Sequence, residues 1–292
     1  MDEFRLINEI VDVLGEAASG PSIVIGPGDD AAVVAVTSGH EVVSSIDTFV
    51  ADVHFPAKAP PADIGYRAFM ASTSDLAAMA ATPKYALVAL TIPEVDQDWV
   101  RSLSEGFVDA ALSCGMSVCG GNLSRGPLAL TISVHGEVPQ GKVLTRSGAS
   151  VGEVIQVSGN LGSAAACVRT GVYDTPGIPR RAYFRPQARV DLVKVLRGQA
   201  SAGIDISDGC LQDLDHILKA SHVGATVSST LIPLGEGASV EDALWGGDDY
   251  QLLITADTLL EGFHAIGKVT SGRELLLDGE PIGAGGYDHF RA

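Results

Sequence analysis

The spacing of apolar residues predicts most of the helices and strands in this chain. Near the start, Leu6, Ile10 and Leu14 recur at helical spacing, and Gly15 follows at the end of the pattern. Related patterns predict helices over residues 63–79, 98–114, 163–169, 189–196 and 211–221. Short apolar runs predict strands over residues 31–36, 41–46, 86–92, 117–119, 128–137, 153–158, 203–206, 226–229, 252–255 and 265–269.

Single polar or small residues predict several boundaries. Asp63 is expected to cap the helix that follows it, and Asp47 to end the strand over residues 41–46. Residues 120–122 are predicted to form a turn, and residues 180–187 a surface loop. Strands and helices alternate in both halves, which predicts an α/β or α+β fold. The turn-rich segment over residues 139–152 is the candidate junction between domains of residues 1–138 and 139–292.

Composition places the chain among folded globular proteins, because 46% of its residues are hydrophobic and only 19% are charged. No apolar run is long enough to span a bilayer, and the start of the chain lacks a basic and apolar signal segment. The four cysteines, Cys114, Cys119, Cys167 and Cys210, are scattered and lack the tight spacing of a zinc knuckle. We therefore expect reduced thiols and a cytoplasmic location, with no membrane partner.

The formal net charge of −17 argues against nucleic acid as a partner, because nucleic-acid binding requires a basic surface. The same charge repels a phosphorylated substrate unless metal ions intervene. Any anionic ligand is therefore expected to bind together with cations.

Aspartates recur at strand ends and glycine turns, among small residues rather than beside lysine or arginine. They are Asp29, Asp30, Asp47, Asp75, Asp205 and Asp208. Each one alone is as easily explained by a cap or a solvated turn. Together they favour a magnesium site, since magnesium binds a few carboxylates together with water and substrate phosphates.

Other common catalytic patterns are missing from the sequence. It contains no P-loop, no protein-kinase signature and no convincing Ser/His/Asp or Cys/His set. The glycine-containing segments over residues 120–122 and 159–162 are open to two interpretations, a phosphate cradle or a plain connection, with a plain connection slightly favoured for the second.

Longer motifs in a fixed order resemble one family over nearly the whole chain. They are GDDAAV (28–33), SIDTFVADVHF (45–55), SDLAAMAATPKYAL (74–87), GGNLSRGPL (120–128), GASVGEVIQVSGNLG (148–162), DISDG (205–209), GGDDYQLL (246–253), IGKVTSG (266–272) and GYDHF (286–290). Together they are similar to the thiamine-monophosphate kinases, which are members of the aminoimidazole ribonucleotide synthetase-like superfamily.

The resemblance implies ATP-dependent conversion of thiamine monophosphate to thiamine diphosphate, with several Mg²⁺ ions as cofactors. It implies two α/β domains of the aminoimidazole ribonucleotide synthetase-like fold. The first would bind ATP and magnesium and pair in a homodimer, and the second would complete the active site. The implied metal ligands are Asp30, Ser45, Ile46, Asp47, Asp75, Asn122, Asp205 and Asp208. The implied ATP contacts are Gly121, Asn122, Arg146 and Ser207, and the implied substrate contacts are His54, Asp248 and Tyr287.

Two positions depart from the family pattern. Asn122 stands where many relatives have Asp, and Asp248 stands where Glu is common. Both changes keep an oxygen ligand.

The acceptor would be a phosphate monoester that is already ionised near neutral pH, so direct in-line transfer requires no protein general base. Two alternatives to this interpretation are another ATP-dependent enzyme of the same superfamily and a non-catalytic metal- or nucleotide-binding module.

Overall fold

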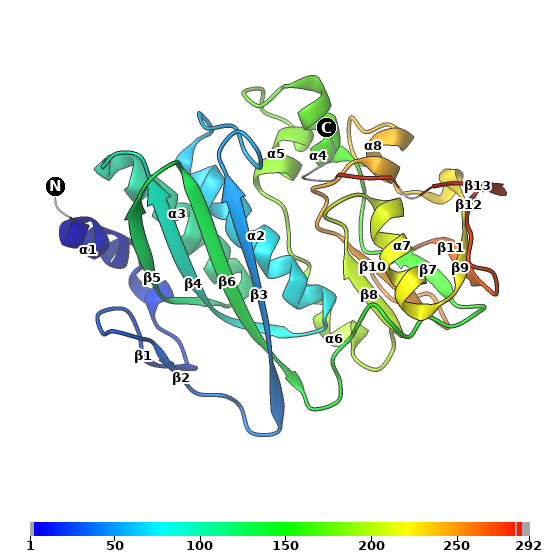
Figure 1. The fold of residues 1–292 in the computed structure, drawn as a ribbon, viewed down its shortest axis with the longest axis horizontal. Coiled ribbons are helices and arrows are strands. Elements are labelled where there is room, and N and C mark those ends of the chain that lie inside the picture. The colour runs from blue at the N-terminus through cyan, green and yellow to red at the C-terminus, as the bar shows by residue number, and fades with distance from the viewer. Residues whose placement is uncertain (1–2, 284, 288–292) are drawn as a thin grey trace. The chain divides into compact units, whose positions relative to one another are not determined.

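The structure is a computed structural model that describes residues 3–283 and 285–287, and it divides into two compact units (Figure 1). One unit consists of Met1–Leu76 and Ala81–Gln140, and the other of Ala77–Ala80 and Gly141–Ala292. Each unit combines a sheet with helices, which confirms the predicted α/β (α+β) class. Residues 288–290 of the predicted GYDHF motif lie outside the described residues.

The elements of the first half of the chain are α1 (Glu3–Leu14), η1 (Gly15–Ala18), β1 (Ile23–Ile25), β2 (Val33–Val34), β3 (His40–Val50), α2 (Pro61–Ala78), β4 (Thr82–Ile92), α3 (Gln97–Cys114), β5 (Ser117–Arg125) and β6 (Ala129–Pro139). Those of the second half are β7 (Val154–Val157), α4 (Ser163–Thr170), α5 (Ile178–Phe184), η2 (Val190–Leu192), α6 (Val193–Leu196), β8 (Ala202–Asp205), α7 (Cys210–Ser221), β9 (Gly224–Val227), η3 (Ser229–Leu231), α8 (Val240–Trp245), β10 (Leu252–Ala256), β11 (His264–Thr270), β12 (Leu275–Leu277) and β13 (Glu280–Pro281).

A four-stranded sheet in the order β3-β6-β4-β5 forms the centre of the first unit. The β3–β6 and β6–β4 pairs are antiparallel, and the β4–β5 pair is parallel. Helices α2 and α3 lie on one face of this sheet (Figure 1). Alternate residues of β6, Leu130, Ile132 and Val134, are fully buried, as expected for the covered face of a sheet.

Two glycines bring α2 and α3 into close backbone contact. A Cβ at Gly65 would lie 2.4 Å from the Leu103 carbonyl oxygen, and one at Gly106 would lie 2.1 Å from the Ala62 carbonyl oxygen. No other residue fits these crossing points without moving a helix. The position of α2 against the sheet, and of the side chains it carries, depends on this contact.

The second unit is built on a seven-stranded sheet in the order β13-β12-β9-β11-β7-β10-β8. All its pairs are antiparallel except β12 with β9. One buried cluster joins Ile155 and Val157 of β7 to Leu214 and Ile217 of α7. Strand β8 ends at Asp205, and α7 begins at Cys210, so the segment between them lies at the edge of a well-packed core.

Four local expectations were wrong. Strand β3 does not end at Asp47 but continues to Val50, because it pairs with β6 along its whole length. Residues 120–122 form no turn, because they pair with β4 inside β5. Asp63 lies inside the first turn of α2 instead of capping it, since the helix begins at Pro61. Residues 180–184 are not a loop but belong to α5, whose Phe184 is fully buried.

No helix in residues 3–283 and 285–287 is both long enough and apolar enough to cross a membrane.

Candidate active site

Asp47 on β3 and Asp75 on α2 interact across the interior of the first unit. Side chains alternate along a strand, so Ser45 and Asp47 lie on one face of β3. The Ser45 hydroxyl donates to Oδ2 of Asp75, and the Ser72 hydroxyl bonds to Asp47. Burial, and secondly the negative charge of Asp75, raise the pKa of Asp47 to about 6. A cation near both groups would favour their ionised forms. This pair therefore has the chemistry of a partial site for a hard cation.

Asp30 lies in the exposed loop between β1 and β2, where its backbone N–H donates to Asp29 Oδ1 at 2.8 Å. Within the described part of the chain, no three His, Cys, Asp or Glu side chains are grouped so that they could hold a metal ion. The structure therefore lends no direct support to Asp30 as a ligand beside the Asp47–Asp75 pair. Convergence of the predicted metal ligands remains a prediction.

Gly121 and Asn122 lie side by side in β5 and pair with Val88 and Ala89 of β4. A Cβ at Gly121 would lie 1.9 Å from the Val88 carbonyl oxygen, so only glycine allows the two strands to pair here. The Asn122 side chain is exposed, and its Nδ2 donates to Ser124 Oγ at 3.0 Å. This contact identifies Nδ2 as the donor and Oδ1 as the acceptor of the Asn122 side-chain amide.

His54 follows β3, and a hydrogen bond holds its neutral imidazole in one tautomer. The Val50 backbone N–H donates to its Nδ1 at 3.0 Å, which puts the proton of the neutral ring on Nε2. Phe49 packs edge-on against the imidazole, with ring centroids 5.8 Å apart. The imidazole is therefore oriented to donate a hydrogen bond through Nε2.

In the second unit, three segments that carry predicted site residues are joined by backbone hydrogen bonds. Asp248 N–H donates to the Ser207 carbonyl at 2.9 Å, and Tyr250 N–H donates to the Ile206 carbonyl at 2.8 Å. Tyr287 N–H donates to the Asp208 carbonyl at 3.0 Å. The structure thus brings the segment after β8 together with the segment before β10 and with Tyr287. Asp205 is buried at the end of β8, directly before this cluster.

The segment before β10 is held in an unusual conformation. Asp248 has a φ of 70° and Tyr250 a φ of 49°, a left-handed region that costs a side chain roughly 1 kcal/mol. The Tyr250 hydroxyl donates to Asp248 Oδ1 at 3.1 Å. A Cβ at Gly247 would lie 2.2 Å from the Ser207 carbonyl oxygen. Close packing and the tyrosine together fix the direction of the Asp248 carboxylate.

Asp213 is a buried carboxylate that the sequence did not single out. It lies under the segment between β8 and α7. Its Oδ2 accepts the backbone N–H groups of Ser207, Asp208 and Gly209, each at 3.1 Å. Burial and the nearby charge of Asp208 raise the pKa of Asp213 to about 7, against the lowering effect of the three N–H groups. The signal in the sequence was a glycine before a helix with a carboxylate four residues later.

Asp249 anchors the segment before β10 in a similar way. The Gly162 N–H, at the start of α4, donates to both of its carboxylate oxygens at 2.8 and 3.0 Å. Burial raises the pKa of Asp249 well above its usual value, and the charge of Asp248 adds to this effect. At the end of the glycine turn over residues 159–162, the Gly162 N–H is therefore already hydrogen-bonded to a side chain of the protein itself.

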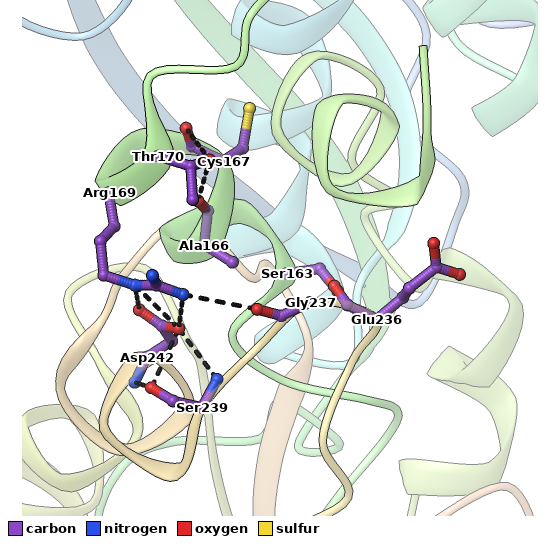
Figure 2. A network of polar contacts seen from close by, with 9 residues as sticks. All are labelled: Ser163, Ala166, Cys167, Arg169, Thr170, Glu236, Gly237, Ser239 and Asp242. Atoms are coloured by element: carbon purple, nitrogen blue, oxygen red, sulfur yellow. Dashed lines mark hydrogen bonds and ion pairs between the residues drawn. The ribbon is translucent and has the colours of Figure 1, made fainter. Parts of the chain in front are cut away.

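Arg169 of α4 and Asp242 of α8 are joined by an ion pair, as Figure 2 shows. The Arg169 guanidinium donates to Asp242, with Nε–Oδ1 and Nη2–Oδ2 distances of 2.9 and 2.7 Å. Asp242 also accepts from Ser239 in a capping box at the start of α8. These contacts hold the pKa of Asp242 down to about 2, chiefly through the Arg169 hydrogen bonds. Helix α8 ends at Trp245, so this ion pair positions the segment that carries Asp248.

Arg146 lies away from the joined segments. Its carbonyl accepts from Ser221 Oγ at 3.2 Å, at the C-terminal end of α7, whereas Asp208 lies just before the N-terminal end of that helix. A helix of twelve residues is about 18 Å long. The predicted ATP contact of Arg146 is therefore not supported by proximity to Ser207, and it remains a prediction.

The curated relatives that match this chain agree on one family. The family model for AIR synthase related protein, N-terminal domain, matches residues 28–138. Thiamine-monophosphate kinase of Escherichia coli strain K12 is 37% identical over 99% of this chain and 98% of that protein. The crystal structure of thiamine-monophosphate kinase from Stenotrophomonas maltophilia superposes with a TM-score of 0.87 at 34% identity, covering 97% of this chain and 98% of that one. AaThiL complexed with AMPPCP and TMP has a TM-score of 0.82 at 28% identity, covering 99% of this chain and 97% of that one.

The Arg169–Asp242 pair generates a stability prediction. Replacing Arg169 with Gln should lower the free energy of unfolding at pH 7, because it leaves the buried Asp242 carboxylate without its guanidinium partner. The pKa of Asp242 is lower in the folded than in the unfolded chain, so its contribution is present above about pH 4 and lost as the pH falls towards 2. Urea unfolding of both proteins at several pH values measures this difference.

Lys219→Gln is the matched control, because it removes an exposed ion pair to Asp215 within one helix. It should change stability by only a few tenths of a kcal/mol. An Arg169→Gln protein as stable as the control at pH 7, or a difference that grows towards acid pH, would contradict the prediction.

Proposed function

The chain belongs to the thiamine-monophosphate kinase family, and we propose that it transfers the γ-phosphoryl group of ATP to thiamine monophosphate, yielding thiamine diphosphate. The observation that carries this proposal is the match to these kinases over almost the whole length of the chain. The ATP analogue and TMP in the AaThiL complex support ATP and thiamine monophosphate as the two substrates.

We propose that the transfer is assisted by magnesium held by oxygen ligands. The Asp47–Asp75 interaction supports this assignment, because two facing carboxylates raise each other's pKa unless a cation compensates them. The full proposed set is Asp30, Ser45, Ile46, Asp47, Asp75, Asn122, Asp205 and Asp208. Bound magnesium would neutralise phosphate charge, which a chain with a net charge of −17 requires for two anionic substrates.

The two units take different parts in this proposal. The first unit binds ATP through Gly121 and Asn122, and the second contributes Arg146 and Ser207. His54 donates through its Nε2–H to the substrate phosphate, an assignment supported by the Val50 contact to Nδ1. Asp248 and Tyr287 contact the substrate, an assignment supported by their shared attachment to residues 207 and 208.

The acceptor oxygen of thiamine monophosphate already carries negative charge near neutral pH. We therefore propose direct in-line transfer, in which no side chain removes a proton from the acceptor and none becomes phosphorylated. The work of the protein is to orient the two phosphate groups and to exclude water around them.

We propose that the chain forms a homodimer through the open face of the first unit's sheet. Even-numbered residues of β3 lie on this face, where Val42 is 45% and Ile46 is 64% exposed. Leu87 of β4 lies on the same face and is 37% exposed. A second copy would bury this apolar strip, which an isolated unit leaves in water.

We also propose a cytoplasmic location. Support comes from the cysteines, because none of the four forms a disulfide and Cys119, Cys167 and Cys210 are buried.

Replacement of Asp47 or Asp75 by Ala is expected to lower turnover at least about 100-fold, because each removes a proposed magnesium ligand. ADP release with and without thiamine monophosphate, measured across a range of magnesium concentrations, gives the rates. The control is Asp98→Ala, an exposed carboxylate of α3, which should keep the wild-type rate. Folded Asp47→Ala or Asp75→Ala protein with near-normal rates at low magnesium would overturn the metal assignment.

Incubation with γ-labelled ATP alone should leave no covalent label on the protein after denaturation, since the acceptor attacks ATP directly. Addition of thiamine monophosphate should move the label into thiamine diphosphate. Stable protein-bound label formed without the acceptor would disprove direct transfer.

Ile46→Glu is expected to convert the dimer to a monomer, because it places facing negative charges in the apolar strip. Light scattering after size-exclusion chromatography measures the mass. Leu112→Glu on α3, where the leucine is 57% exposed, is the control that should stay dimeric. A wild-type protein that is monomeric at micromolar concentration would rule out the proposed interface.

A further inference from the structure

The buried carboxylate of Asp213 occupies a position that resembles an anion site. Three consecutive N–H groups, those of Ser207, Asp208 and Gly209, converge on its Oδ2. Such a row of N–H groups before a helix commonly binds phosphate or another anion. Here the side chain of the protein, which is only 2% exposed, fills the position from inside.

Gly209 explains why this carboxylate is needed. It precedes α7, has a φ of 131° and provides no capping side chain. Its Cβ would lie 2.9 Å from the Trp245 carbonyl oxygen, so a serine or aspartate cap is excluded at this position. Asp213, one turn into the helix, points back towards the helix start and satisfies the N–H groups instead.

The direction of the three N–H groups also sets the direction of the carbonyls. With the N–H groups of residues 207–209 turned towards Asp213, the Ser207 carbonyl accepts from Asp248 and the Asp208 carbonyl accepts from Tyr287. Gln212 reinforces this arrangement, because its Nε2 donates to the Tyr287 carbonyl at 2.9 Å. One internal carboxylate therefore organises all three joined segments.

We propose that Asp213 is a positioning residue that acts as a built-in anion: it closes the helix start to free phosphate and orients Ser207 and Asp208 towards a metal-bound phosphate. The inference rests on the proposed function, because it assigns Asp208 to magnesium and Ser207 to the nucleotide. In this proposal Asp213 contacts neither magnesium nor the nucleotide, but it controls the positions of Asp208 and Ser207.

The test compares Asp213→Ala, Asp213→Asn and the control Asp215→Asn at pH 8. Asp215 lies on the same helix, is partly exposed, and pairs only with Lys219 among the ion pairs of the described chain. Both Asp213 variants should raise the magnesium concentration for half-maximal rate about tenfold, the usual effect of losing a group that orients a metal ligand. The control should change this value less than twofold.

Chemical rescue separates this role from a merely structural one. Formate can enter the space vacated in Asp213→Ala and accept the three N–H groups. It should restore the magnesium dependence towards that of the wild type and raise the melting temperature of this variant, with no effect on wild type or Asp215→Asn. Asp213→Asn keeps the side-chain volume and tests the charge if Asp213→Ala does not fold.

Two results would overturn the inference: an unchanged magnesium requirement in folded Asp213 variants, or a melting temperature of Asp213→Ala that does not respond to formate. The melting experiment needs no turnover. If wild-type protein proves inactive on thiamine monophosphate, the proposed function fails, whereas the formate response still decides whether Asp213 fills an anion position.

Discussion

Aspartates held close to other aspartates dominate this structure. Asp47 lies near Asp75, Asp213 near Asp208, and Asp249 beside Asp248. Like charges at short range in a partly buried setting destabilise each other, and burial raises the pKa of the more enclosed member of each pair. The chain has 36 acidic and 19 basic residues, so lysine and arginine are too few to pair with every carboxylate. Asp47 is compensated by the Ser72 hydroxyl, and Asp213 and Asp249 by backbone N–H groups.

The chain divides this work between inner and outer carboxylates. The inner ones bind the protein itself: Asp213 accepts three N–H groups of the segment after β8, and Asp249 accepts the Gly162 N–H at the start of α4. Their outer neighbours, Asp208 and Asp248, are thereby fixed in direction and remain partly exposed. A rigid inner shell of this kind orients groups for binding more accurately than a free loop does.

Covering one face of a sheet leaves the other face to a partner or to solvent. In the first unit, helices α2 and α3 approach through Gly65 and Gly106 and bury one side of the strands. The alternation of β3 then sends Ser45 and Asp47 to one side and Ile46 to the other. One strand therefore carries both proposed metal ligands and the apolar side chain of the proposed dimer face. Binding and assembly would thus be coupled through a single element.

The sequence alone determined the fold class and the family, because these follow from periodicity, composition and ordered motifs. It also placed Asp205, Asp208 and Asp248 among the residues of interest. Only the tertiary structure decided that β3 runs past Asp47, that residues 120–122 are strand, and that Tyr287 attaches to Asp208. The structure also decided that Asp213 accepts the N–H groups of residues 207–209. Each of these outcomes depends on hydrogen bonds or packing between groups whose spatial arrangement no local pattern of residues specifies.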